Sequence, residues 1–317
     1  MSKYGQLQLN RKVRGSTGQI ELYVDDIKKI KIFVPSESLI NKINGIVRSA
    51  FKKIKLSEQR YRQAEEKLYE LLSISKEEIE RLEVEKTYET NFKEVREAFR
   101  FDAEYYHPKY YLPNKIFKKL PYVKLGDSKY FILKKGIEVG SNAYCDRSKG
   151  ILFLRVSNLS KEGLKMGSSD KYIFKGIYEK LRSIYEPKKG EVLFSKDGTI
   201  GTAVVVDSDF PRCIISSGIV RICIKEEFNP FYLAFVLNST ITQFQVAREK
   251  TGSVIEHLRF SMLREIKVPK LSQQQQEEIA TLIKEHFNLR KEARHLIQKA
   301  IREVEGAIEN ASRSNRE

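Results

Sequence analysis

The stretch Ser38–Leu72, SLINKINGIVRSAFKKIKLSEQRYRQAEEKLYELL, places apolar residues at every seventh position over five heptads. A heptad repeat of this length, without proline and without glycine after Gly45, predicts a coiled-coil helix of about 50 Å. The predicted seam has two rows, which are Ile40, Val47, Ile54, Tyr61 and Leu68, and Ile43, Ala50, Ser57, Ala64 and Leu71.

A second long helix is predicted from Ser272, because Ser272 and Gln275 have the spacing of a capping box. Its seam row is Ile279, His286, Ala293, Ala300 and Ala307, flanked by Ile283, Ile297 and Val304 and by Leu282, Leu289 and Leu296. Small residues dominate one row of each helix, so the two helices are the simplest partners for each other. The direction of their pairing stays open, and His286 is interpreted as a packed residue.

Positive charge is concentrated between these helices. The chain of 317 residues has a net charge of +16, and residues 102–270 alone hold 29 Lys and Arg against 18 Asp and Glu. Residues 1–35 hold 7 against 3, whereas residues 36–101 and 271–317 are almost balanced. A basic excess confined to one segment favours a polyanionic partner, with nucleic acid ahead of an acidic protein or a membrane surface.

The segment 102–270 has the texture of a globular domain. Short apolar runs separated by turn residues predict a mostly antiparallel sheet, and helical stretches follow, so the domain is of the α+β class. The predicted strands are Gly150–Val156, Glu191–Phe194, Thr202–Val206, Cys213–Ile215 and Ile219–Ile224. The predicted helices are Pro230–Leu237, Ile241–Glu249 and Ser261–Glu265.

Polar residues gather at the ends of the predicted strands. The hairpin 196–201, KDGTIG, needs its glycines for positive φ and carries Lys196 and Thr199 near its tip. No Walker loop is present, because no Lys-Ser or Lys-Thr pair follows the glycines in the required frame. Each loop taken alone is more often a turn than a contact, but together they mark candidate DNA contacts. The candidates in these loops are Arg155, Ser157, Asn158, Lys196, Thr199, Ser216 and Ser217.

Catalytic motifs, metal sites and cofactor motifs are not predicted. Glu265-Ile-Lys267 fits half of a nuclease motif, but such triplets are common by chance in so charged a chain, and His257 has no neighbouring nucleophile. Cys145, Cys213 and Cys223 lack the C-x-x-C spacing, so they are interpreted as small apolar residues. With no signal peptide and no apolar run long enough for a bilayer, the expected location is the cytoplasm, without a membrane partner.

Three motifs in order resemble the DNA-specificity subunits of Type I restriction-modification systems. Residues 100–109, RFDAEYYHPK, look like the family's start of a target-recognition domain, and residues 190–201, GEVLFSKDGTIG, are similar to its central hairpin. Residues 252–258, followed by IKVP at 266–269 and a Gln-rich helix start, resemble its exit into a spacer helix. This sequence departs from the pattern by having one complete recognition domain instead of two.

The resemblance implies a non-catalytic subunit without its own cofactor, which reads one half of a bipartite site on double-stranded DNA. Its spacer helices would bind methyltransferase subunits, and a separate restriction or motor subunit could join the complex. It adds Arg248, Lys250 and Ser253 near the exit to the candidate contacts. The implied organisation is a tail remnant at 1–35, spacer helices at 36–75 and 271–317, a charged, partly helical connector at 76–101 and the recognition domain at 102–270. The alternative is a coiled-coil scaffold protein with a degenerate recognition domain.

The beginning of the chain repeats the end of the recognition domain. Gln6, Gln8, Arg11, Gly15 and Ser16 align with Gln243, Gln245, Arg248, Gly252 and Ser253, and after a gap of one residue Leu22, Ile30 and Lys31 align with Leu258, Ile266 and Lys267. Two interpretations follow. The favoured one is a remnant that packs on the spacer helices, because the complete copy already occupies this place in its own domain. The other is a segment that completes a recognition domain on another chain, which includes a homodimer.

Overall fold

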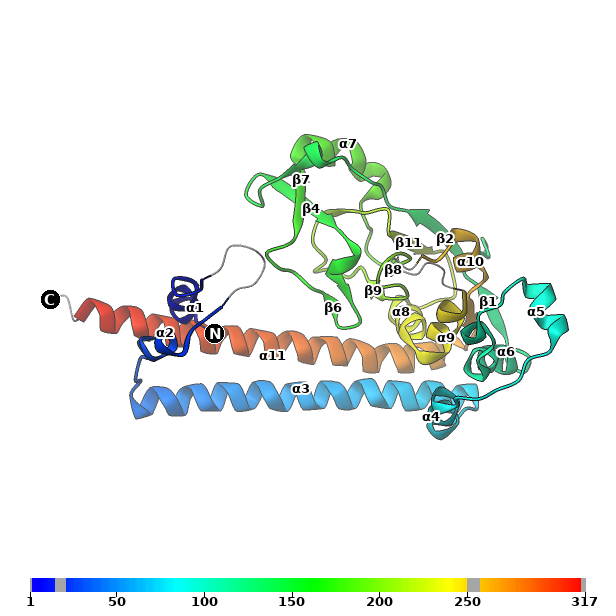
Figure 1. Ribbon diagram of the computed structural model, residues 1–317, viewed down its shortest axis with the longest axis horizontal. Helices are drawn as coiled ribbons and strands as arrows, with labels where there is room; N and C mark the ends of the chain where they lie inside the picture. The colour runs from blue at the N-terminus through cyan, green and yellow to red at the C-terminus, as the bar shows by residue number, and fades with distance from the viewer. Residues whose placement is uncertain (1, 15–20, 250–256, 315–317) are drawn as a thin grey trace. The chain divides into compact units, whose positions relative to one another are not determined.

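The computed structural model describes residues 2–14, 21–249 and 257–314, and its chain divides into two compact units (Figure 1). The first unit consists of residues 1–60 and 285–317, and the second consists of residues 61–284. Two long helices, α3 (Glu37–Leu72) and α11 (Gln273–Ser314), contribute to both units. Among the described residues, no helix has the length and apolar character needed to cross a membrane.

Both long helices begin at a capping serine. The backbone N–H of Gln275 donates to Ser272 Oγ over 3.3 Å, and the Gln275 side chain accepts from the Ser272 N–H over 3.0 Å, as the predicted capping box requires. At the start of α3, the N–H of Leu39 donates to Ser36 Oγ over 3.4 Å. Each serine thus satisfies a backbone donor that the first helical turn leaves free.

Ion pairs show that α3 and α11 lie side by side in opposite directions (Figure 1). In the first unit Lys42 pairs with Glu303, Lys53 with Glu292 and Arg60 with Glu285. Moving forward along α3 therefore corresponds to moving backward along α11, which settles the direction that the heptad pattern left open. Within this unit His286 is 5% exposed, and its Nδ1–H donates to the Ser57 carbonyl oxygen over 2.8 Å. The interpretation of His286 as a packed residue agrees with this position.

The buried part of the predicted seam consists mainly of small residues. The deeply buried members are Ala50, Ser57, Ala64, Leu68, Ile279, His286, Ala293 and Ala300. The half-buried members are Ile43, Val47, Ile54, Tyr61, Leu71 and Val304. Two assignments need correction, because Ile40 is 42% exposed and Ile297 is 37% exposed. A helix of 3.6 residues per turn drifts by about 20° per heptad, so a strict seven-residue row turns away from the partner helix over a long span.

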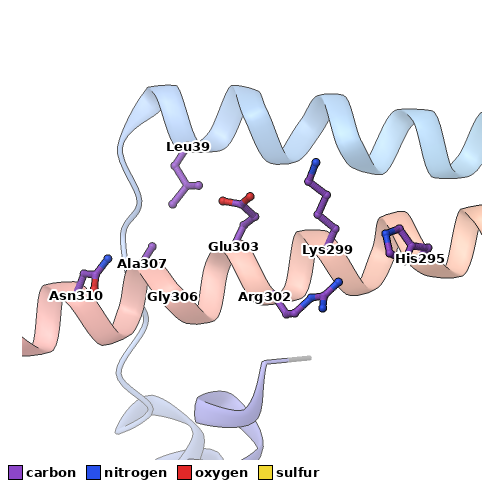
Figure 2. Close-up of a pocket in the computed structure, with 8 residues that line it drawn as sticks. All are labelled: Leu39, His295, Lys299, Arg302, Glu303, Gly306, Ala307 and Asn310. Atoms are coloured by element: carbon purple, nitrogen blue, oxygen red, sulfur yellow. The ribbon is translucent and has the colours of Figure 1, made fainter.

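A shallow groove of about 630 Å³ lies between the start of α3 and the later part of α11 (Figure 2). Leu39 of α3 and Glu303 of α11 point toward the opposite helix, whereas Arg302 points away from it. Gly306 and Ala307 line the groove with little side-chain volume. The helices are therefore less tightly filled at this end, where Ile40 is exposed.

Reversing the charges of Lys53 and Arg60 to Glu is expected to lower the midpoint of thermal unfolding by about 2–4 °C. Exposed pairs contribute little each, and the like charges created opposite Glu292 and Glu285 repel by a similar amount. Changing Glu292 and Glu285 to Lys in the same chain should restore the midpoint, measured by circular dichroism at low salt. Equal midpoints for the reversed and the restored chain would contradict the antiparallel register.

In the part of the second unit that the structure describes, there are two four-stranded sheets and two short two-stranded pairs. One sheet has the order β10-β4-β7-β3 and the other has the order β2-β11-β8-β9. All strand pairs are antiparallel except β10 with β4, which are parallel. The strands are β1 (Tyr122–Lys124), β2 (Phe131–Lys135), β3 (Tyr144–Cys145), β4 (Gly150–Leu154), β5 (Leu159–Ser160), β6 (Gly163–Leu164), β7 (Lys171–Phe174), β8 (Val192–Ser195), β9 (Ala203–Val205), β10 (Cys213–Ile215), β11 (Ile219–Ile224) and β12 (Lys267–Pro269).

Strands β4 and β10 are buried on both faces. Leu152 and Leu154 belong to a core with residues of β8, β9 and β11, whereas Phe153 between them belongs to a second core under α7 (Lys175–Tyr185). Strand side chains alternate between faces, so a strand between two layers must be apolar throughout. Cys213 lies in the first core, and burial raises the pKa of its thiol to about 12. This agrees with its interpretation as a small apolar residue.

The α+β class with a mostly antiparallel sheet is confirmed, although several element bounds differ from the prediction. The predicted strand over 150–156 ends at Leu154, because Val156–Asn158 form a short 3-10 helix. The sequence did not reveal β2, β7 or α7. The remaining helices of this unit are α4 (Lys76–Val84), α5 (Phe92–Ala98), α6 (Leu112–Phe117), α8 (Pro230–Asn238), α9 (Thr240–Glu249) and α10 (Phe260–Glu265), with 3-10 turns at Ala103–Tyr106, Pro108–Tyr111 and Ser141–Ala143.

The N-terminal segment adds α1 (Lys3–Asn10) and α2 (Val24–Lys28) to the first unit. Lys3 Nζ pairs with Glu309 of α11 over 2.7 Å, and the Tyr4 hydroxyl donates to the same carboxylate over 2.6 Å. The segment therefore contacts a spacer helix, as the remnant interpretation expects. Gly15, Ser16, Gly252 and Ser253 of the sequence repeat lie outside the described residues.

Candidate nucleic-acid interface

Backbone hydrogen bonds bring the three predicted loops of the second unit together. The N–H of Lys196 in the hairpin donates to the Gly218 carbonyl over 2.8 Å. The N–H of Ser216 donates over 2.8 Å to the carbonyl of Leu154, which ends the strand before Arg155. We name the resulting cluster the loop junction, defined as residues 136–138, 155–158, 195–202, 216–218 and His257.

The hairpin of the loop junction is held by its own polar groups. Ser195 Oγ donates to the Thr199 carbonyl over 2.6 Å and accepts from the Thr202 N–H over 2.9 Å. Gly198 and Gly201 have φ of +65° and +89°, so the predicted need for glycines is confirmed. Gln243 of α9 donates to the Gly201 carbonyl over 2.8 Å. These bonds fix the loop and leave Thr199 exposed at its tip.

A fourth loop, which the sequence did not suggest, completes the loop junction. It follows β2, and the N–H of Ile137 donates to the Ile215 carbonyl over 3.1 Å. Glu138 accepts a hydrogen bond of 2.5 Å from the Ser217 hydroxyl. Gly136 allows this approach, since a Cβ atom there would lie 2.1 Å from the Ser216 carbonyl oxygen. The only sequence signal was the pair of glycines at 136 and 140 around a charged residue.

Asp197 links the hairpin to the segment before α10. Its carboxylate pairs with Lys196 Nζ over 2.5 Å and accepts from His257 Nδ1 over 2.9 Å. Burial alone would raise the pKa of Asp197, but the hydrogen bonds from Lys196 and His257 outweigh it and lower the pKa. The N–H of Leu258 also donates to the Lys196 carbonyl over 2.8 Å. Because Lys196 forms an ion pair with Asp197 within the chain, less of the positive charge of Lys196 is available to a ligand.

The predicted contact residues of the loop junction differ in accessibility. Ser157 and Thr199 are exposed, while Arg155, Lys196 and Ser217 are half-buried. Arg155 Nη2 donates to the Ser169 carbonyl over 2.8 Å.

Asn158 and Ser216 are 3% and 7% exposed, so both side chains lie in the interior of the domain. The Asn158 amide accepts from the Arg155 N–H and donates to the Lys165 carbonyl and to Asp170. These bonds occupy both amide donors of Asn158 within the domain, so the assignment of Asn158 and Ser216 as base contacts stays a prediction that this arrangement does not favour.

Arg248 belongs to a separate cluster in the same unit. Its guanidinium carbon lies 4.5 Å from the ring centre of Tyr105 and 4.9 Å from that of Tyr111. The guanidinium carbon of Arg100 also lies 4.6 Å from the ring centre of Tyr105, and Arg100 pairs with Asp102 through bonds of 2.6 and 2.7 Å. The RFDAEYYHPK motif thus packs against α9. Lys250 and Ser253 lie outside the described residues.

Three residues considered for catalysis have structural partners. Glu265 pairs with Lys124 over 2.6 Å, and Lys267 Nζ donates to Asn114 over 3.0 Å. His257 is bound to Asp197 in the loop junction. The interface is therefore a set of polar loops at strand ends, and its exposed hydroxyls can donate or accept hydrogen bonds at base edges.

Comparisons with known proteins agree with this fold. Residues 145–302 match the family described as Type I restriction modification DNA specificity domain. The structure is similar to the S subunit of a Type I restriction-modification system from M. genitalium, with 13% identity, a TM-score of 0.50 and coverage of 95% of this chain and 70% of that one. The HsdS subunit from Thermoanaerobacter tengcongensis is also matched, with 14% identity, a TM-score of 0.40 and coverage of 95% and 68%. No curated protein matches the chain.

The family match places residues 145–302 in the class of DNA-specificity domains, and the fold agrees with it. The chain carries one recognition domain of the Type I restriction-modification specificity family, and the resemblance found in the sequence is confirmed.

Proposed function

We propose that this chain is the sequence-reading subunit of a Type I DNA methyltransferase and reads one half-site of double-stranded DNA through the loop junction. The observation that carries the proposal is the joining of four polar loops at one place in the segment 102–270, which holds 29 Lys and Arg against 18 Asp and Glu. Phosphate contacts by Lys and Arg would fix the register on DNA, and exposed side chains at loop tips would read base edges.

Specific roles follow from accessibility. Thr199 and Ser157 are the exposed hydroxyls of the loop junction and are proposed to contact bases. Lys134 and Lys135 are exposed at the end of the edge strand β2, directly before Gly136, and are proposed to contact phosphates. Half-buried Arg155, Lys196 and Ser217 would support these contacts from inside the loops.

The antiparallel pair of α3 and α11 is proposed to dock modification subunits and to set the spacing between half-sites. Ion pairs of Lys42 and Lys53 with α11 flank the seam and hold the two helices together as one docking element. The chain itself would be non-catalytic and would act in the cytoplasm, with the methyl transfer supplied by the bound subunit. A restriction or motor subunit would join the same complex.

The proposal is tested by co-expressing the chain with a Type I modification subunit and mapping methylated sites by sequencing. A defined methylated motif that disappears without the chain is the expected result. Methylation that is the same with and without the chain would overturn the proposal. In that case, a coiled-coil scaffold function would become the better explanation.

Thr199→Ala is expected to weaken binding to the mapped half-site by about 5- to 100-fold, because one lost base contact costs about 1–3 kcal/mol. Binding to unrelated duplex should be unchanged, since that affinity comes from phosphate contacts. Fluorescence anisotropy across a salt series measures the affinity for the half-site and the affinity for unrelated duplex. Ser183→Ala, at an exposed position on α7, is the matched control. Equal losses for both duplexes would show that Thr199 does not read sequence.

A further inference from the structure

The N-terminal segment and the end of the recognition domain share one local structure. Helix α1 corresponds to α9, α2 corresponds to α10, and α3 begins at the residue that corresponds to the start of α11. The Gln8 side chain accepts from the Lys31 N–H over 2.8 Å and donates to the Lys31 carbonyl over 3.0 Å. Gln245 makes the same two bonds to Lys267, also over 2.8 and 3.0 Å. The sequence repeat is therefore a structural repeat.

In the complete copy, the body of the recognition domain covers this segment. Strand β12 pairs with β1, with Val268 opposite Val123, and Val268 is 0% exposed. Phe244 of α9 is 5% exposed and contacts Tyr110, with ring centres 6.3 Å apart. Leu263 of α10 is 0% exposed. The complete copy thus shows that the body of a recognition domain covers these positions.

The corresponding positions of the N-terminal copy are open. Leu7, which corresponds to Phe244, is 54% exposed, and Ile27, which corresponds to Leu263, is 48% exposed. Ile32, which corresponds to Val268, is 83% exposed. Within the described ranges, no strand pairs with residues 31–33. Three apolar side chains that the complete copy buries therefore face solvent here.

A groove of about 840 Å³ adjoins this open face within the first unit. It is lined by Leu7, Phe33, Val304 and Ile308, among others. Val304 and Ile308 are half-buried, whereas Leu68 and Leu72, which hold the corresponding places on α3, are 0% and 2% exposed. The spacer helix therefore also presents apolar surface where its counterpart is covered.

We propose that residues 3–14 and 21–35 and the adjoining groove are a docking site for a second recognition-domain body that lacks a tail of its own. Its β1-like strand would pair with residues 31–33, and its aromatic residues would cover Leu7. The chain's own body cannot supply this strand, because its β1 is already paired with β12. The identity of the occupant rests on the proposed function of residues 102–270. The open face and the groove of the docking site do not depend on that function.

Docking would give the chain two recognition domains, one from its own residues and one completed from outside. An unpaired strand edge is a template for pairing with another strand, and exposed apolar side chains beside it add the burial that makes such pairing stable. Ile32 and Leu7 supply these side chains. A subunit completed in this way would read two half-sites.

The test fuses a second body to the chain. Residues 102–242 are joined directly to residues 6–317, because Gln243 corresponds to Gln6, so the added body runs into α1 as it normally runs into α9. Hydrogen exchange measured by mass spectrometry should show amides 32–34 exchanging fast in the parent chain and about 100-fold slower in the fusion. The amides of Lys267 and Val268 serve as the paired reference in both proteins.

The matched control is the same fusion with Val123→Pro in the added body, since proline cannot donate to a ladder and should remove the protection of residues 32–34. Equal exchange at residues 32–34 in parent and fusion would overturn the proposal. Protection in the parent chain that grows with protein concentration would also overturn it, by showing that a second copy covers the edge. The exchange measurement uses no DNA. Protection in a fusion that fails to bind a half-site would therefore contradict the proposed function and leave the docking proposal standing.

Discussion

Replacing Glu191 by Ala is expected to lower the free energy of unfolding of the second unit by about 3–5 kcal/mol. Glu191 and Arg221 are 7% and 1% exposed, and their side chains meet through two hydrogen bonds of 2.8 and 2.7 Å. Arg221 Nη1 also donates to the Ile184 carbonyl over 2.6 Å. Removing the carboxylate alone leaves a guanidinium inside the domain without its counter-charge, which is the costly case for a buried pair.

Urea unfolding followed by circular dichroism measures this loss, with Glu265→Ala as the control. Glu265 pairs with Lys124 at an exposed site, so its removal should cost less than about 1 kcal/mol. The double variant Glu191→Leu with Arg221→Met should recover much of the lost stability, because it removes both charges. A double variant as unstable as Glu191→Ala would show that the charge imbalance is not the cause.

Stability should also depend on pH through Glu191. Burial raises the pKa of this carboxyl, but the hydrogen bonds from Arg221, the Lys188 N–H and Cys223 outweigh it and lower the pKa below its usual value. The ionised form is therefore the one that the fold stabilises. Its contribution is complete above the ordinary Glu pKa and is lost as the pH falls through the lowered value, and Glu191→Gln should flatten this part of the profile.

The sequence predicted the parts of the fold that depend on local pattern. The heptads of Ser38–Leu72 and the capping box at Ser272 specify helices by spacing alone, and both are present. The repeat was visible because residues such as Gln8 and Gln245 bond to the backbone and tolerate few replacements. Strands β2 and β7 were missed because their charged residues hide the apolar alternation, as in Phe131–Lys135.

The candidate site was predicted as a set of loops and not as a set of side chains. Turn residues revealed where the chain reverses, but burial depends on which loops meet in space. Asn158 was assigned to DNA because it is polar at a strand end, and it is instead enclosed by bonds to Lys165 and Asp170. Glu138 was not considered, since its partner Ser217 is distant in sequence.

Gly136→Ala is expected to destabilise the second unit by about 1–3 kcal/mol and to weaken half-site binding more than binding to unrelated duplex. The new methyl carbon would lie 2.1 Å from the Ser216 carbonyl oxygen and 2.6 Å from the Ile215 carbonyl oxygen, so backbone must move. The movement would separate the loop of Glu138 from the loop of Ser217 without changing any charge. Phosphate contacts would remain, while the arrangement that places Thr199 and Ser157 would be lost.

Gly167→Ala is the matched control, because a Cβ atom at Gly167 would meet nothing within 4 Å. Unfolding by urea and anisotropy with the half-site and an unrelated duplex, at a temperature where both variants are folded, separate stability from recognition. If Gly136→Ala binds both duplexes as the parent chain does, the close approach of these two loops serves folding alone. A selective loss for the half-site would mean that the glycine places the reading loops, because only their relative position has changed.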